Sequence, residues 1–415
     1  MIAESPPAQR KLLLLAPFAP RADAPHGGGR VLAQIVSRLA TRHRLALAYL
    51  RRADEPPMDD RLRALCELVE EISGPRIGAP LTQPWVRRGR LTLAAISGTP
   101  MWVTDCASRT YAERVRALAA RWTPDVVQLE YHVMGQYLPA LQACRAPRVL
   151  VEYEPAARSA PYLVRRGAAA RWLNARDRAN WRRFEAAAVR EVQAVVVFTD
   201  EDKDALRALV PDACIVTIPL GAEIPDRPLN PAGAMPPTLL FVGSFVHPPN
   251  VEAAVRLARA IFPQVHARVP DARLYIVGDR PPPEVMRLAD PSIVVTGFVP
   301  EVKPFLDRAT AVVAPLWSGG GMRVKVLEAL AAGKAVVATT LAVEGLGVAG
   351  GVQLLLADSD ATFAEAVIRL LVSPGERVAL AGRARAWACS SLGWDRSILK
   401  YEKLYAELLE RARHV

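Results

Sequence analysis

Residues 315–340, PLWSGGGMRVKVLEALAAGKAVVATT, place three consecutive glycines, an arginine, a lysine and a glutamate between two apolar runs. The flanking runs AVVA (311–314) and AVVAT (335–339) are typical of buried strands, and the segment between them has helical spacing. We expect that helix to begin near Met322 and to end at Gly333, which suits a C-cap. The apolar residues at helical spacing predict its buried face: Val324, Leu327, Leu330 and Ala331.

The start of this predicted helix suits an anion. Arg323 and Lys325 oppose the helix dipole there, and a bound anion would reverse that cost. Backbone N–H groups of residues 319–322, which include Gly320, Gly321 and Met322, would complete a phosphate site. Glu328 lies one turn deeper, where it can accept hydrogen bonds from sugar hydroxyls. A nucleotide diphosphate with its ribose satisfies all of these groups. The alternative is a glycine-rich loop before an ordinary helix, with a surface Lys325–Glu328 pair worth about 0.2–0.5 kcal/mol.

Outward from this stretch, apolar strand patterns alternate with helical ones over the whole chain. Such continuous apolar strands predict parallel sheets that are covered on both faces. The pattern occurs twice, and the proline-rich segment 222–238 separates the two runs. We therefore predict an α/β protein of two doubly wound, Rossmann-like domains facing each other across a cleft. The predicted strands are 11–16, 45–50, 125–130, 148–152, 194–198, 215–218, 238–243, 273–277, 292–296, 311–314 and 335–339.

Composition narrows the class of protein. The chain has 415 residues, more than one core usually supports, and its apolar runs are too short to span a bilayer. The five cysteines are scattered without a C-x-x-C pair, which indicates thiols in a reducing compartment and predicts neither zinc ligands nor disulfides. The net charge is +11, and residues 1–230 carry +8 of it. A basic half can attract nucleic acid, anionic lipid or phosphorylated substrates.

The stretch also resembles the signature of glycosyltransferase family 4 (glycosyl transferases group 1), whose members are retaining enzymes of the GT-B fold. The residues that carry the resemblance run from Gly321, Arg323, Lys325, Leu327 and Glu328 through Gly333 and Val336–Thr339 to Glu344–Leu346. Further segments are similar in the second domain: IPLGAEI (218–224), LLFVGSFVHPPNVEAA (239–254), IVGDRPPPEV (276–285) and VTGFVPEVKPFLDRATAVVAPL (295–316).

The resemblance implies roles and bounds. Glu328 would bind the nucleotide ribose, and Arg323 and Lys325 would bind the donor pyrophosphate. The loop that begins at Gly243 would border the donor, although GSFVHPPN has neither the arginine nor the lysine that the family usually places there. Position 320 is glycine, where the family has a glutamate that touches the donor sugar. The implied parts are an acceptor-side domain over 1–222, a nucleotide-sugar domain over 238–392 and a helix over 393–415 that returns to the first domain.

Two features of the first domain suit the acceptor side of the cleft. Gly27, Gly28 and Gly29 follow the first strand and let backbone N–H groups approach a ligand; a plain strand–helix turn is the alternative. Glu130 and His132 end another strand, and in extended chain two such residues point the same way. Either could orient the acceptor hydroxyl or stabilise oxocarbenium charge, or they could simply end a strand.

Residues 158–190 contain nine arginines, two acidic residues and several aromatics. A solvated arginine-rich helix face is one interpretation, and a surface that rests on anionic lipid is the other. We predict a cytoplasmic hexosyltransferase, peripheral on the inner membrane face, that moves a sugar from a nucleotide-diphosphate donor to a hydroxyl of a glycan, lipid-linked or small-molecule acceptor in polysaccharide or glycolipid synthesis. We expect no cofactor and no metal. The alternatives are a nucleotide-sugar epimerase of the same fold and a basic nucleic-acid-binding protein.

Overall fold

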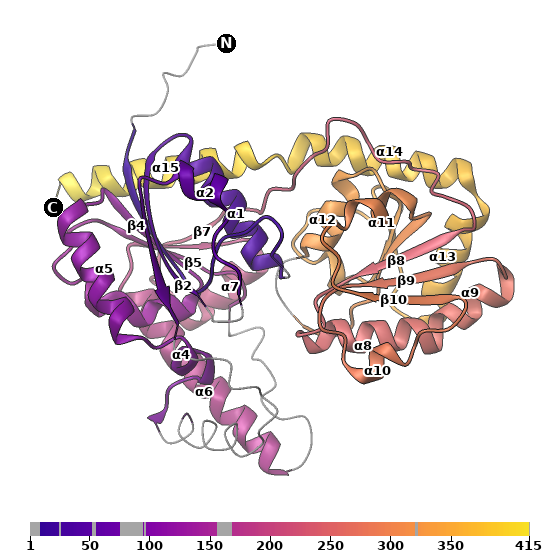
Figure 1. Ribbon diagram of the computed structural model, residues 1–415, viewed down its shortest axis with the longest axis horizontal. Coiled ribbons are helices and arrows are strands. Elements are labelled where there is room, and N and C mark those ends of the chain that lie inside the picture. Colours follow the sequence, from indigo (N-terminus) through magenta and orange to yellow (C-terminus); the bar gives the residue numbers. More distant parts are fainter. Residues whose placement is uncertain are drawn as a thin grey trace. The chain divides into compact units, whose positions relative to one another are not determined.

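The computed structural model describes residues 9–24, 26–51, 55–74, 94, 97–155, 168–319 and 323–414, with side chains in the long helix from residue 171 onward. These residues form two compact units. The first comprises residues up to 24, 28–219 and 397–415, and the second comprises 25–27 and 220–396. Figure 1 shows the ribbon of each unit, a sheet packed between helices.

The first unit contains a seven-stranded parallel sheet in the order β3-β2-β1-β4-β5-β6-β7. Its strands are β1 (Lys11–Ala16), β2 (Arg44–Arg51), β3 (Leu68–Ser73), β4 (Val126–Glu130), β5 (Arg148–Val151), β6 (Ala194–Val197) and β7 (Ile215–Thr217). Its helices are α1 (Gly27–Ala40), α2 (Asp60–Leu65), α4 (Met101–Asp105), α5 (Arg109–Trp122), η1 (His132–Leu141), α6 (Ala168–Arg190), α7 (Asp200–Leu209) and most of α15 (Trp394–Arg413).

Alternate side chains of each strand point to opposite faces of this sheet. Leu13, Leu15, Val127 and Leu129 pack in one core with residues of α5, η1, α6 and α7. The intervening residues face the other side, where Tyr405 of α15 donates to the side-chain oxygen of Gln128. Helix α15 therefore covers the face of the first sheet that is opposite to α6.

The second unit contains a six-stranded parallel sheet in the order β10-β9-β8-β11-β12-β13. Its strands are β8 (Thr238–Val242), β9 (Arg273–Val277), β10 (Ile293–Gly297), β11 (Ala311–Ala314), β12 (Val336–Ala338) and β13 (Leu355–Leu356). Its helical elements are α8 (Pro248–Arg256), the π segment η2 (Leu257–Ile261), α9 (Phe262–Arg268), α10 (Pro283–Met286), α11 (Lys303–Arg308), α12 (Val324–Ala331), η3 (Leu341–Val343), α13 (Asp360–Val372) and α14 (Pro374–Ser391).

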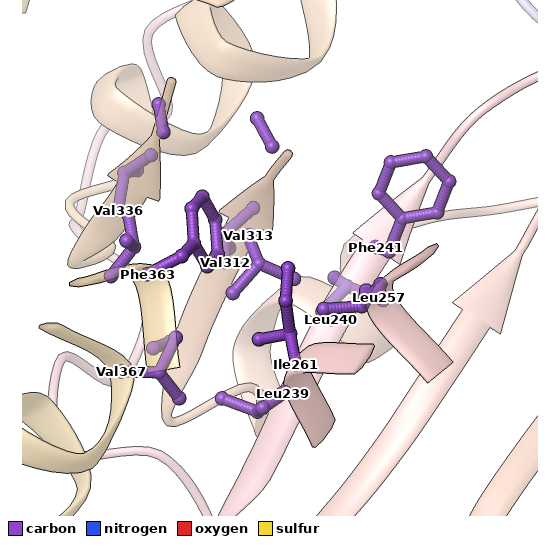
Figure 2. Packing of buried hydrophobic residues seen from close by; sticks show 14 of the residues in the cluster. Leu239, Leu240, Phe241, Leu257, Ile261, Val312, Val313, Val336, Phe363 and Val367 are labelled. Carbon is purple, nitrogen blue, oxygen red and sulfur yellow. The ribbon is translucent and has the colours of Figure 1, made fainter. Parts of the chain in front are cut away.

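Apolar side chains of η2 and α13 pack against the central strands of the second sheet. Side chains of β8, β11 and β12 pack against Leu257 and Ile261 of η2 and against Phe363 and Val367 of α13 (Figure 2). These residues are buried. The strands appear as continuous apolar runs in the sequence because both faces of the sheet are covered.

The predicted doubly wound α/β architecture is confirmed, and all eleven predicted strands are present within a residue or so at each end. The edge strands β3 and β13 were not predicted. Strand β3 carries glutamates in its middle, and β13 has only two residues, so neither has the apolar run of a central strand.

Candidate functional site

In both sheets the strand order reverses once, and ligands of open α/β sheets bind beside the strand ends at that point. In the second sheet the reversal lies between β8 and β11. The loop after β8 begins at Gly243, and the loop after β11 contains the triple glycine and leads into α12. The stretch that the sequence singled out therefore lies at the switch point of its own sheet.

Helix α12 begins at Val324, directly after Arg323, and Gly333 follows its end with a φ of 74°. Arg323 is 6% exposed and donates to the carbonyl oxygen of Gly319 at 3.1 Å. Glu328 is half-buried one turn further along the helix. Gly320, Gly321 and Met322, which we predicted as phosphate-binding residues, lie outside the described residues.

Lys325 is the residue that joins the two loops. Its Nζ donates to Oδ1 of Asn250 at 2.6 Å and lies 4.7 Å from the ring centroid of Phe241 in β8. Asn250 in turn donates to the carbonyl oxygen of Ser244, and a side chain at Gly243 would collide with Asn250. The structure thus brings Lys325 and Gly243 together through Asn250.

Two further residues at this edge were not found from the sequence. Asn250 is the second polar group of the bridge, but a single asparagine after two prolines carries no recognisable signal. Asp279 follows β9, is 6% exposed and has a buried Oδ1 without a hydrogen-bond partner among the described residues. Nε of Arg280 lies 3.5 Å from the other carboxylate oxygen of Asp279, so a carboxylate and a cation meet directly after β9.

In the first sheet the order reverses between β1 and β4. Gly27, Gly28 and Gly29 form the first turn of α1, which follows β1. A Cβ atom on Gly28 would lie 1.7 Å from the hydroxyl oxygen of Tyr131, the residue that follows β4. The predicted glycine loop therefore does meet the strand end that holds the second predicted pair, and a side chain at position 28 would require the ring of Tyr131 to move.

Glu130 and His132 do not point the same way, contrary to our expectation for extended chain. The strand ends at Glu130, and Tyr131 adopts a φ of 71°, which turns the chain into η1. Glu130 accepts hydrogen bonds from Gln128 at 2.5 Å and from Tyr153 at 2.7 Å, on the α15 face of the sheet. His132 lies between the rings of Trp102 and Trp181, on the α6 face.

The pKa values of the two groups are both raised, for different reasons. Glu130 is fully buried, and burial raises its pKa to about 7 despite the hydrogen bonds from Gln128 and Tyr153. His132 is 5% exposed, and its Nδ1 lies 2.8 Å from Oε2 of Glu152. Burial lowers the pKa of His132, but the charge and hydrogen bond of Glu152, with the charge of Glu185, outweigh that effect and raise it.

Glu152 follows β5, and Glu185 lies on α6, so the sequence could not show that both approach His132. One ligand atom from each of the three residues lies within 4.8 Å of the others. Such a set fits an imidazolium ion held between carboxylates, and it is also a possible ligand set for a divalent cation.

The arginine-rich segment falls partly outside the described residues, because residues 156–167 are not described. Within α6, Arg171, Arg178 and Arg182 are exposed at spacings of seven and four, which places them on one face. The indole of Trp172 is 60% exposed beside them. No described helix is long and apolar enough to cross a membrane.

The chain is similar to known proteins both in sequence and in fold. The family model of the glycosyl transferases group 1 matches residues 236–373. An uncharacterized 44.6 kDa protein from the cps region of Klebsiella pneumoniae is 25% identical over 139 residues, which span 31% of this chain and 36% of that protein.

Solved structures match over nearly the whole chain. The sucrose-phosphate synthase of Thermosynechococcus elongatus is 17% identical with a TM-score of 0.69, covering 97% of this chain and 100% of that one. Anabaena Alr3699/HepE in complex with UDP and glucose is 14% identical with a TM-score of 0.65, covering 95% and 99%. The chain therefore has the GT-B fold, and within it residues 236–373 are similar to the glycosyl transferases group 1.

Proposed function

We propose that the protein is a retaining glycosyltransferase that moves a sugar from a nucleotide-diphosphate donor to an acceptor hydroxyl. The observation that carries the proposal is the Lys325–Asn250–Gly243 bridge at the switch point of the second sheet, directly beside the start of α12. Two cations and the positive end of a helix dipole there suit a pyrophosphate. HepE, which shares the fold, has been solved with UDP and with UDP-glucose.

The donor would replace contacts that the cations make within the protein. Lys325 would turn from the neutral oxygen of Asn250 to a charged phosphate oxygen, which is the stronger acceptor. Arg323 would exchange a backbone carbonyl for the second phosphate in the same way. Because these two residues supply the positive charge, we propose that transfer needs no metal and continues in the presence of EDTA.

The acceptor side would use His132. A protonated imidazole has two N–H donors and no acceptor, so it can orient a sugar hydroxyl but cannot stabilise an oxocarbenium ion. Glu152 holds its Nδ1, which leaves Nε2 to act on a substrate. Glu130 is buried on the other face, and we propose that it acts indirectly, through Tyr153, whose ring stacks on Tyr131 at a centroid distance of 3.8 Å.

The experiment is a donor and product analysis. The purified chain is offered UDP-, GDP- and TDP-hexoses, with and without a panel of hydroxyl acceptors, and the product is analysed by NMR. We expect acceptor-dependent release of the nucleotide and an anomeric configuration equal to that of the donor. An inverted product would exclude retention, and an epimerised sugar that forms without an acceptor would favour an epimerase.

We further propose that the exposed arginines of α6 hold the protein on the inner face of the cytoplasmic membrane, close to a lipid-linked acceptor of polysaccharide or glycolipid synthesis. The support is one face with Arg171, Arg178 and Arg182 and with the exposed indole of Trp172. Each arginine near an anionic surface contributes about 1 kcal/mol, so three give a salt-sensitive attachment.

Vesicle co-sedimentation tests the membrane proposal. Binding should require phosphatidylglycerol, weaken as salt shortens the Debye length, and fall when Arg171, Arg178 and Arg182 become serine. The matched control replaces three exposed arginines of the second unit, Arg268, Arg287 and Arg308, and loses the same charge. Equal binding of both triple variants would exclude α6 as the attachment face.

A further inference from the structure

The loop between β11 and α12 runs along one edge of α8. Trp317 contacts Arg256, Ser318 contacts Glu252, and Gly319 contacts Pro249. Positions 249, 252 and 256 are three and four residues apart, so they share one helix face. We call these three residues the loop-facing edge of α8. Three consecutive loop residues are thus each held by a successive position of the same helix.

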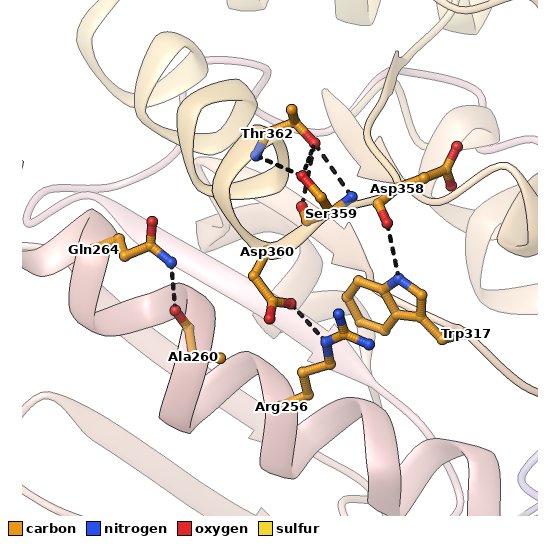
Figure 3. Close-up of polar contacts among 8 residues, drawn as sticks. All are labelled: Arg256, Ala260, Gln264, Trp317, Asp358, Ser359, Asp360 and Thr362. Atoms are coloured by element: carbon orange, nitrogen blue, oxygen red, sulfur yellow. Dashed lines mark hydrogen bonds and ion pairs between the residues drawn. The ribbon is translucent and has the colours of Figure 1, made fainter.

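Arg256 contacts both Trp317 of the loop and the start of α13. Its guanidinium carbon lies 3.9 Å from the ring centroid of Trp317, which is a stacked cation–π arrangement. Its Nε donates to Oδ1 of Asp360 at 2.6 Å, which fixes the plane of the guanidinium group. The indole N–H of Trp317 donates to the carbonyl oxygen of Asp358 at 3.2 Å (Figure 3).

The start of α13 anchors this arrangement from the far side. Ser359 caps the helix and forms a capping box with Thr362, so Asp358 and Asp360 are held in place (Figure 3). Asp358 also accepts hydrogen bonds from the backbone N–H and hydroxyl of Thr340, which follows β12. Trp317 is therefore clamped between α8 and the first turn of α13.

The other end of the loop depends on close approach. Gly319 has a φ of 91°, and a Cβ atom there would lie 2.6 Å from Cγ of Pro249. Its carbonyl oxygen is the acceptor for Arg323. A shift of Trp317 along α8 would accordingly move Gly319 and, through it, one of the two proposed phosphate-binding cations.

We infer that Arg256 is a positioning residue for the donor site: by stacking on Trp317 it fixes the loop that presents Arg323 to the donor pyrophosphate. This inference rests on the donor site proposed above. Arg256 need not touch the donor, because its effect passes through Trp317 and Gly319. Its side chain is 41% exposed, so its loss should change the loop more than the stability of the unit.

The test compares Arg256→Ala with Arg268→Ala. Arg268 is a matched control, because it also pairs with an acidic residue of α13, Glu365, but belongs to α9 and not to the loop-facing edge of α8. UDP and GDP affinities are measured by calorimetry, hydrogen exchange of the backbone of residues 316–331 is measured without ligand, and Tm is recorded. We expect Arg256→Ala to weaken nucleotide affinity about threefold to tenfold and to speed exchange, while Arg268→Ala changes neither.

Two further variants guard against a general loss of fold. Arg256→Lys keeps the charge but not the planar stacking and should recover affinity only in part, and Trp317→Phe should lie between wild type and Arg256→Ala. If Arg256→Ala leaves both hydrogen exchange and nucleotide affinity unchanged, and Lys325→Ala still weakens nucleotide binding, the positioning role of Arg256 is wrong but the donor site stands. If Lys325→Ala also binds like wild type, the proposed donor site itself is wrong.

Discussion

The two switch points differ in how their polar groups are assembled. In the second unit Arg323, Lys325 and Glu328 lie within one loop and one helix, so chain order alone brings them together. In the first unit His132, Glu152 and Glu185 come from three separate elements, and Glu130 lies on the opposite face of the sheet. Contiguous sites can be found in a sequence, whereas assembled ones need the fold. The proposed tasks differ as well: the second unit would bind the donor, and the first unit would orient the acceptor hydroxyl.

The largest expected effect is that of His132 on turnover, and it tests whether donor binding and hydroxyl orientation are separate tasks. His132→Gln keeps a donor toward Glu152 but removes the cation, and we expect kcat to fall about 100-fold or more with nucleotide affinity unchanged. Because the pKa of His132 is raised and the protonated form is the proposed donor, wild-type kcat should decline as pH rises through that pKa. His43→Gln is the control, since His43 is another buried histidine of the first unit, and burial lowers its pKa to about 4. If His132→Gln also lost nucleotide affinity, the two tasks would not be separate.

The second effect concerns the donor cations. Arg323→Ala and Lys325→Ala should each weaken UDP or GDP binding by roughly 1.5–3 kcal/mol, the range for hydrogen bonds to charged groups. Lys303→Ala serves as the control, because Lys303 is exposed and also opens a helix of the second unit. Calorimetric titration should show no change for that variant. Equal affinities in all three variants would remove the donor-site assignment.

A third, somewhat smaller effect is a pH dependence of stability in the first unit. The folded pKa of Glu130 is raised to about 7 from an ordinary value of 4.5, so folding favours its protonated form. That stability is complete below the ordinary pKa and is lost as pH rises through the folded one. Between pH 5 and pH 7 the free energy of unfolding should drop by about 2 kcal/mol from this group. Denaturant titrations at several pH values measure this effect, and the free energy of unfolding of Glu130→Gln should not show the drop. The same dependence of the free energy of unfolding on pH in wild type and variant would contradict the prediction.

The smallest expected effect is at Glu328. Glu328→Gln retains an acceptor but drops the charge, so we expect UDP affinity to fall by about 1 kcal/mol. A 2′,3′-dideoxy nucleotide lacks the ribose hydroxyls and should bind wild type and variant alike. Glu365→Gln, an exposed position of the same unit, controls for charge. If the variant loses the same affinity for both nucleotides, Glu328 does not contact the ribose.

Much of the fold could be predicted because the central strands are short, continuous apolar runs. Runs such as KLLLLA and AVVVF are buried on both faces, and that burial leaves a pattern in the sequence. The edge strand β3 was not predicted because LVEEIS pairs with a neighbour on one side only and carries two half-buried glutamates in place of a continuous apolar run. The ten residues of η1 were not predicted for another reason, because Pro139 and the 3-10 geometry leave no regular helical pattern in the sequence.

Within the candidate site, some residues could be predicted from the sequence and others could not. Arg323 and Lys325 were predicted because cations at a helix start oppose the dipole unless an anion binds there. Asn250 could not be predicted, since its role exists only where Lys325 reaches the loop after β8. The turn at Tyr131 was also invisible, because a tyrosine with positive φ has no sequence signal, and this single dihedral angle sends Glu130 and His132 to opposite faces.

Helix α15 bears on the order in which the chain acquires its structure during synthesis. Tyr405 completes the buried Gln128–Glu130 cluster, and Glu402 lies 3.0 Å from Nε of Arg42. Residues 397–413 are translated only after the whole of the second unit, so the first unit must wait for residues encoded beyond it before its own core is closed. A ribosome stalled between the two would carry a first unit with one sheet face uncovered. Chaperones would therefore be expected to engage the N-terminal half late, and C-terminal truncations to be cleared because of damage at the opposite end of the sequence.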